Sequence, residues 1–248
     1  MTDFVPAHAQ GPKGQSGALL FCDHATNALP ASYGTLGLSA EQISDHIAYD
    51  PGAAALTEAL SQRLRSRSVY CNFSRLLIDP NRGLERDDLV LQQSDGVTTP
   101  GNQEVNWEER ERRIERYYRP YHDFLEGELE AHIATHADPF ILSIHSFCRA
   151  LRSQTSHRPW QVGVLWKDDA PSAQYIIGYL RDQGLNVGDN QPYSAKAYNY
   201  TVDRHVGARG LRHVTLEIRQ DLIADENHVR QLADLLEAPF RVLIGVET

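Results

Sequence analysis

The sequence predicts an α/β fold, with one domain built on a mainly parallel or mixed central sheet and helices on both faces. Short apolar runs alternate with longer amphipathic segments from one end of the chain to the other, a pattern typical of parallel sheets covered on both faces. No repeat, low-complexity tract or linker divides the 248 residues, a length that suits one large domain. We therefore expect a flexible N-terminal arm over residues 1–17 and a single domain over residues 18–248.

The apolar runs are too short for helices and are expected to form strands. They are GALLFCDHA, SVYCNFSRLLID, PFILSIHSF, QVGVLW and LRHVTLEIRQDLI, the last of which is expected to continue into a helical segment. Helices are expected within 38–64, 107–136, 170–184 and 226–244. In the first of these, Pro51 suits an early helical position with Asp50 as cap, and in the second Pro120 predicts a kink or break. The long polar segment 81–102 is expected to be a loop with a functional role.

The composition excludes several classes of protein. A net charge of -9 argues against nucleic-acid and membrane partners, although a local arginine cluster still allows a small anionic substrate. The three cysteines form no CxxC pair, which argues against a disulfide framework and favours a reducing, cytoplasmic location. No signal peptide or transmembrane run is expected. The absence of G-x-S-x-G, GxGxxG and P-loop motifs argues against a serine hydrolase and against nucleotide-dependent chemistry.

Polar side chains stand at the ends of three predicted strands. Asp23 and His24 follow the first strand, His145 and Ser146 end the third, and Glu217 lies between apolar neighbours in the last. Ligands of open α/β sheets bind beyond the carboxyl ends of the strands, so these groups are candidates for one site. A single histidine in such a place is often only a hydrogen-bonded structural group, but a carboxylate in an apolar run has to be paired, coordinated or protonated.

Two imidazoles and a third oxygen ligand are a suitable set for zinc with one position left open. Zinc polarises a carbonyl and lowers the pKa of water, and a separate carboxylate such as Glu217 then acts as general base. Cys22 could be a thiol nucleophile because it shares a strand face with His24, but a small core residue is the simpler interpretation. In SRLLIDPNR, Arg75 and Arg82 flank a strand end and are either surface residues or anchors for a carboxylate.

The sequence resembles the N-formylglutamate amidohydrolase family. The resemblance covers nearly the whole chain after the N-terminal arm, and it is carried by runs that occur in the family's order and spacing: CDHATNALP, HIAYDPGAAAL, SRLLIDPNR, SDGVTTPGN, YYRPYH, SIHSF, VGVLW, GDNQPYS, YTVDRH and HVTLEIRQDLI. The family is similar in fold to zinc carboxypeptidases and the aspartoacylase group. The resemblance therefore implies a zinc-exopeptidase-like fold.

The resemblance also implies a set of site residues. His24 and Asn27 stand at the positions of an H-x-x-E zinc motif, His145 is the distant zinc ligand, and Glu217 is the catalytic base. Zinc is the implied metal, with another divalent ion as the alternative. Asn27 is a neutral amide where the related enzymes have a charged ligand, so Asp23 is an alternative oxygen donor.

The implied substrate contacts lie in the Asp79-Pro80-Asn81-Arg82 run and nearby. Asp79 is expected to hold the loop, while Asn81, Arg82, Arg75 and Tyr193 bind the substrate. Further motif residues are candidates for either substrate contact or a structural role: His46, Asp50, Asp95, Asn102, Asn190 and His205. Arg149 follows SIHSF where the family commonly has Thr-Pro, and it either contacts an anion or points to solvent.

The implied reaction is hydrolysis of the amide bond of a small acidic N-acyl amino acid. N-formyl-L-glutamate, giving formate and L-glutamate, is the expected substrate, and the resemblance associates this reaction with histidine degradation. The alternatives are deacylation of another N-acyl amino acid or small peptide, and a non-catalytic binding protein with a degenerate metal site. The oligomeric state is not predicted.

Overall fold

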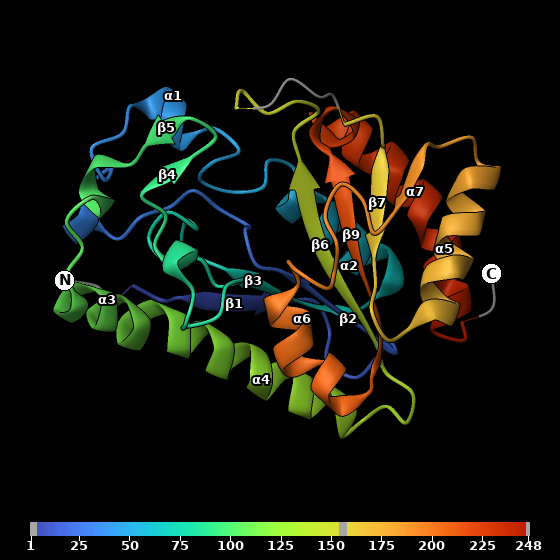
Figure 1. Ribbon diagram of the computed structural model, residues 1–248. Helices are drawn as coiled ribbons and strands as arrows, with labels where there is room; N and C mark the ends of the chain where they lie inside the picture. Colours follow the sequence, from blue (N-terminus) through green and yellow to red (C-terminus); the bar gives the residue numbers. More distant parts are fainter. Residues whose placement is uncertain (1–3, 154–157, 247–248) are drawn as a thin grey trace.

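The computed structural model describes residues 4–153 and 158–246. Its central sheet has seven strands in the order β1-β3-β2-β6-β9-β7-β8 (Figure 1). These strands are β1 (Ala7–Gln10), β2 (Ala18–Cys22), β3 (Arg67–Cys71), β6 (Phe140–Phe147), β7 (Val162–Leu165), β8 (Val187–Asp189) and β9 (Arg212–Arg219). Strands β3, β2, β6 and β9 are mutually parallel, whereas β1 is antiparallel to β3 and β7 is antiparallel to β9. The predicted mixed, mainly parallel α/β sheet is confirmed.

Helices cover both faces of this sheet. The longest are α2 (Ala53–Leu64), α4 (Arg119–Ile133), α5 (Ala170–Asp182) and α7 (Glu226–Leu243), with shorter α1 (Ala40–Ile43), α3 (Trp107–Arg113) and α6 (Tyr200–His205). Single 3-10 turns occupy Ala31–Tyr33, Asp87–Leu89, Pro100–Asn102, Gly207–Arg209 and Gln220–Ile223, and β4 (Gln93–Ser94) and β5 (Val97–Thr98) form a separate hairpin. Among the described residues, no helix is long and apolar enough to cross a membrane.

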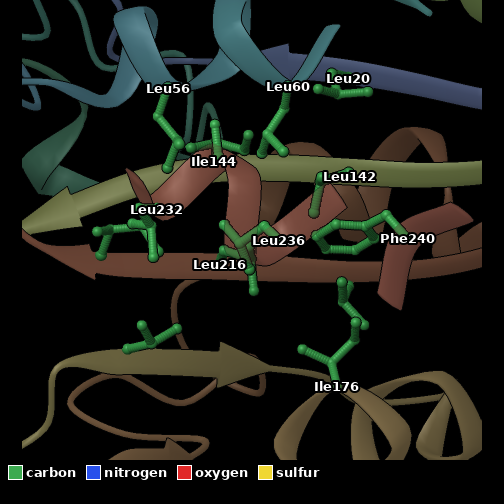
Figure 2. Packing of buried hydrophobic residues seen from close by; sticks show 14 of the residues in the cluster. Leu20, Leu56, Leu60, Leu142, Ile144, Ile176, Leu216, Leu232, Leu236 and Phe240 are labelled. Carbon is green, nitrogen blue, oxygen red and sulfur yellow. The ribbon is translucent and has the colours of Figure 1, made fainter. Parts of the chain in front are cut away.

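The alternation of side chains along the buried strands divides the core into two layers. Even-numbered residues such as Leu20, Leu142 and Leu216 pack against α2, α5 and α7, as Figure 2 shows. Odd-numbered residues such as Leu19 and Ile141 pack against α4 and α6. Because successive strand residues point to opposite faces, His145 and Glu217 lie on the face that carries α4 and α6.

Several sequence-based expectations need correction. Residues 7–10 are not a loose arm, because they pair with β3 as an edge strand and so satisfy backbone groups that would otherwise face solvent. The second predicted strand ends at Cys71, after which Ser74 bonds the Ala48 carbonyl and the chain turns. The short strand β8 was not predicted.

The two proline-based expectations are also corrected in detail. Helix α2 begins at Ala53 with Gly52 as its N-cap, so Asp50 does not cap it. Pro120 does not break the long helix, because it lies in the first turn of α4, where its missing N–H is tolerated. The irregularity instead precedes it, as a π-helical turn over Ile114–Tyr118 that joins α3 to α4 (Figure 1).

Candidate metal centre and substrate cleft

The strand ends bring the predicted reactive groups together. His24 follows β2 by two residues, and His145 and Glu217 face each other in the parallel register of β6 and β9. All three side chains are buried and all three line one cavity of about 360 Å³. This volume is in the range of pockets for small molecules. The expectation that polar groups gather beyond the carboxyl ends of the parallel strands therefore matches the geometry.

His24, Asp50 and His145 form a compact group, called here the metal cluster. One potential ligand atom from each lies within 4.8 Å of the other two, and among the described residues this is the group of histidine, cysteine and acidic side chains that could hold a metal ion. Asp50 Oδ2 lies 2.9 Å from His145 Nδ1 and 3.4 Å from His24 Nδ1. Both imidazoles thus direct Nδ1 towards the same carboxylate.

The opposite nitrogens of the two rings face further carboxylates. His24 Nε2 lies 2.8 Å from Asp79 Oδ1, and His145 Nε2 lies 3.5 Å from Asp23 Oδ2. Asp23 in turn accepts a hydrogen bond from the Tyr121 hydroxyl. Carboxylates behind ligating histidines orient the ring and increase its basicity, so Asp79 and Asp23 stand where outer partners of a metal site are found.

The electrostatics of the cluster follow from this density of carboxylates. Burial by itself would raise the pKa of Asp50, but the charge of His24 and the hydrogen bond from His145 outweigh it and hold that pKa well below its usual range. Burial likewise opposes protonation of His145, but the contacts with Asp23 and Asp50 raise its pKa well above the ordinary value. Asp50 is therefore a carboxylate rather than a neutral acid.

The donor set fits a divalent transition metal such as zinc. Two imidazole nitrogens and a carboxylate oxygen are the three-ligand pattern of catalytic zinc sites. The Nδ1 atom of His24 is buried without a hydrogen-bond partner although it faces Asp50. A buried ring nitrogen without a hydrogen-bond partner is costly, and a metal ion bound by the cluster would satisfy it.

Glu217 lies beside the cluster without belonging to it. Its Oε2 atom is buried with no hydrogen-bond partner among the described residues. Burial raises the pKa of Glu217 to about 7, while the positive charge of His145 opposes the rise. In the neighbouring strand β7, Gly163 is the residue paired with Glu217. A Cβ atom on Gly163 would lie 2.1 Å from the Gln191 carbonyl oxygen and 3.2 Å from Glu217 Cβ. Gly163 therefore leaves room for the 190–198 loop beside Glu217.

Arginines and tyrosines form the other side of the cavity. Arg82 donates to Asp88 over 3.2 Å and stacks over Tyr198 at 5.5 Å, and Arg158 donates to the Tyr193 hydroxyl over 2.8 Å and stacks over that ring at 4.9 Å. All four side chains line the cavity. A polar cavity with guanidinium groups beside a metal cluster can bind a small anion and hold it near the reacting centre.

Of the three predicted metal ligands, His24 and His145 are brought together. The amide nitrogen of Asn27 donates to the Ile43 carbonyl, and Asn27 is not among the residues that line the cavity. The alternative donor Asp23 stands outside the cluster, behind His145. Asp50 is the third member of the cluster, and the hydrogen bond from its backbone N–H to the His24 carbonyl holds it beside the end of β2.

The predicted substrate-binding residues already have contacts with other groups of the protein. Arg75 lines the cavity, but its guanidinium lies 2.7 Å from Asp79 and 3.6 Å from Asp50. Asn81 also lines it, with its side-chain oxygen accepting from the Thr201 N–H. Asp79 holds the loop as expected, because its Oδ1 atom accepts from the Asn81 N–H, and it binds His24 as well. The catalytic and binding roles of these residues stay predictions.

The remaining motif residues fall into two groups. His46 and Asp95 line the cavity. Asn102, Asn190 and His205 have structural contacts elsewhere. Asn102 bonds Arg113 and two carbonyls, the Asn190 side-chain oxygen accepts from the backbone N–H groups of Trp166 and Ala195, and His205 lies between His122 and Glu126.

The roles of the two isolated candidates also become plain. Arg149 is exposed and is not among the residues that line the cavity. Cys22 belongs to the core beneath α2, and burial raises the pKa of its thiol well above the usual value, as expected of a core residue.

Sequence reasoning missed the role of Asp50 and missed Arg158 altogether. The sequence predicts Asp50 as a helix cap before Pro51 and as a candidate for substrate contact or a structural role, and its place in a run shared with the family is the available signal for a site residue. Arg158 follows no strand end and lies in no run that resembles the family, so no local pattern marks it.

Comparison with known proteins agrees with this geometry. The family model described as N-formylglutamate amidohydrolase matches residues 16–224. The structure of gene product Atu2144 from Agrobacterium tumefaciens is similar with a TM-score of 0.90 and 31% identity, over 97% of this chain and 96% of that one. The N-formylglutamate amidohydrolase from Ralstonia eutropha JMP134 is similar with a TM-score of 0.78 and 21% identity, over 98% of both chains. No match was found among curated proteins.

The fold, the cleft and the family match together define an α/β amidohydrolase with a candidate His-Asp-His metal site. The chain belongs to the N-formylglutamate amidohydrolase family.

Proposed function

We propose that this protein hydrolyses N-formyl-L-glutamate to formate and L-glutamate with a zinc ion bound by His24, Asp50 and His145. The observation that carries the proposal is the buried carboxylate of Glu217, which lines the cavity beside the metal cluster and whose Oε2 atom has no hydrogen-bond partner in the part of the chain that the structure describes. Family membership supports the reaction class, and the cationic side of the cleft supports an acidic substrate.

The metal ligands proposed here replace Asn27 with Asp50. A bound zinc ion supplies Lewis-acid activation of the amide carbonyl and of water. Asp79 and Asp23 fix the orientation of the two imidazoles through their far nitrogens. The hypothesis of a degenerate, non-catalytic site rested on the neutral amide of Asn27, and the carboxylate of Asp50 beside both imidazoles argues against that alternative.

Glu217 is proposed as the general base and then the general acid. Its carboxylate takes a proton from the attacking water, the water oxygen bonds to the formyl carbon, and the proton passes to the nitrogen as the carbon–nitrogen bond breaks. The buried site favours this role because burial raises the pKa of a carboxylate towards neutrality. Arg82 and Asn81, with Arg75 behind them, hold the acidic amino acid during the reaction.

The experiment combines metal analysis with a substrate panel. Purified protein is measured for zinc by elemental analysis, and amine release is followed with N-formyl-L-glutamate, N-acetyl-L-glutamate and N-formyl-L-leucine. We expect about one zinc per chain, fastest turnover of the first substrate, and loss of turnover with a chelator that added zinc restores. Equal rates on all three substrates would contradict the acidic specificity, and full activity without any metal would contradict the metal site. A role in histidine degradation is part of the same proposal.

A further inference from the structure

Arg158 is a buried cation, and none of the carboxylates that the structure describes is its partner. The residue is only 9% exposed, and it lines the cavity. The other two arginines that line the cavity differ, because Arg75 is paired with Asp79 and Arg82 with Asp88. No acidic side chain in residues 4–153 and 158–246 lies within ion-pair distance of Arg158. Buried charges in proteins are normally paired. The guanidinium of Arg158 is therefore suited to pair with an anionic group of a bound ligand.

The surroundings of Arg158 hold it in place and leave donors unused. Its backbone N–H bonds the Arg149 carbonyl over 2.9 Å, and its guanidinium lies over the rings of Tyr193 at 4.9 Å and Phe147 at 6.0 Å. One N–H group donates to the Tyr193 hydroxyl. Because that hydroxyl oxygen is the acceptor, its own proton remains available for a ligand, as do the other N–H groups of Arg158 among the described contacts.

Arg158 and Arg82 occupy the two ends of one aromatic row. The rings of Tyr193 and Tyr198 meet edge to face with centroids 6.1 Å apart, and each ring has one of the two guanidinium groups over it. Burial, followed by the negative charge of Glu217, raises the pKa of Tyr193 to about 12, so this hydroxyl keeps its proton and lies within the electrostatic reach of Glu217. The cavity therefore has a guanidinium group at each of two separate ends, beside the metal cluster and Glu217.

From this geometry we infer that Arg158, together with the Tyr193 hydroxyl, binds a second carboxylate of the substrate while Arg82 binds the first. The inference rests on the proposed amide hydrolysis and makes Arg158 a specificity-determining residue. The substrate class is then an N-acylated dicarboxylic amino acid, with one carboxylate for each arginine. A monocarboxylic amino acid would leave one buried guanidinium without an anion.

The kinetic test uses three substrates and three variants of the full chain. The substrates are N-formyl-L-glutamate and its two monoamides, which lack either the α- or the γ-carboxylate. Arg158→Met is expected to lower kcat/KM for the diacid by about 10- to 150-fold, the equivalent of losing a charge-assisted hydrogen bond. This loss should vanish with one monoamide, and the loss caused by Arg82→Met should vanish with the other. The exposed Arg149→Met is the matched control and should resemble the parent.

A binding measurement separates this inference from the proposed reaction. Calorimetry with the zinc-loaded protein compares glutarate with its monoamide, and Arg158→Met should abolish a preference for the diacid that Arg149→Met retains. If the parent hydrolyses none of the amides but keeps this preference, the proposed reaction fails while the inference stands. The inference is overturned if Arg158→Met leaves binding and kinetics unchanged, or if it weakens the diacid and both monoamides equally, as a structural stacking role would.

Discussion

The two sides of the cleft are built in different ways. On the metal side, the ring nitrogens of His24 and His145 face the carboxylates of Asp50, Asp79 and Asp23. On the basic side, the guanidinium of Arg158 has no carboxylate partner within residues 4–153 and 158–246 and donates to the Tyr193 hydroxyl. The carboxylates on the metal side orient the two imidazoles before anything binds, whereas the guanidinium of Arg158 on the basic side keeps donors available for a ligand. This difference is the basis for proposing that the amide bond is hydrolysed on the metal side and that the substrate carboxylates are bound on the basic side.

The largest effect should come from removing a histidine of the metal cluster. His24→Ala or His145→Ala deletes one of three ligands, so we expect the zinc to be lost and turnover to fall below detection while the sheet stays folded. Elemental analysis, activity and circular dichroism check this. A double variant that keeps one zinc per chain at this cleft would refute the assignment.

A smaller but still large effect should follow from Glu217→Gln. Glutamine has nearly the same shape but does not accept a proton, so kcat should fall by about 10²–10⁴-fold, the usual worth of general acid–base catalysis. Zinc content and substrate affinity should be retained. Loss of zinc in this variant would recast Glu217 as a ligand, and unchanged turnover would remove it from the mechanism.

On the basic side, Arg82→Lys tests whether recognition depends on a fork of two donors. Lysine keeps the charge but loses the planar fork, and kcat/KM on N-formyl-L-glutamate should fall by one to two decades, or about 1.5–3 kcal/mol. Arg86→Lys is the control, because Arg86 pairs with the same Asp88 but does not line the cavity. Equal kinetics for Arg82→Lys and the parent would show that Arg82 is not the anchor.

The Asp79→Asn substitution tests whether the carboxylate that contacts His24 Nε2 contributes to zinc affinity. Asp79 contacts His24 Nε2 and Arg75 together, so its neutral amide should weaken both contacts. Loss of an outer-shell carboxylate typically costs about 10- to 100-fold in metal affinity or activity. Competition with a chromophoric zinc chelator measures the change. Unaltered zinc affinity would show that Asp79 acts only through the loop it holds.

The smallest effect is expected from Asn27→Ala. The Asn27 amide bonds the Ile43 carbonyl and stands outside the metal cluster, so zinc affinity should change little. Asp50→Asn is its matched opposite and should weaken zinc binding strongly, because it removes the charged oxygen ligand. Chelator competition on both variants decides between them, and the reverse ranking would restore Asn27 as the third ligand.

Local patterns in the sequence were enough to predict the central strands and to mark three of the residues that line the cavity. Apolar runs too short for helices predicted the central strands, and polar residues after them marked His24, His145 and Glu217, because parallel strands end at one edge of a sheet. The same local rules failed where a residue's partner is remote. The edge strand Ala7–Gln10 pairs with β3, which lies far along the chain, and its short Ala-His-Ala-Gln run shows no strand pattern of its own.

Only the tertiary structure decided which oxygen completes the metal cluster and which arginine lacks a partner. Asp50 precedes a proline and a glycine, a context that predicts a helix cap, and its proximity to His145 arises from contacts across the fold. The sequence does not mark Arg158, because the lack of a described carboxylate partner becomes visible only when the groups packed around its guanidinium are known. Strand and helix positions follow from local periodicity, whereas the choice among chemically equivalent carboxylates and arginines is made by packing over long sequence separations.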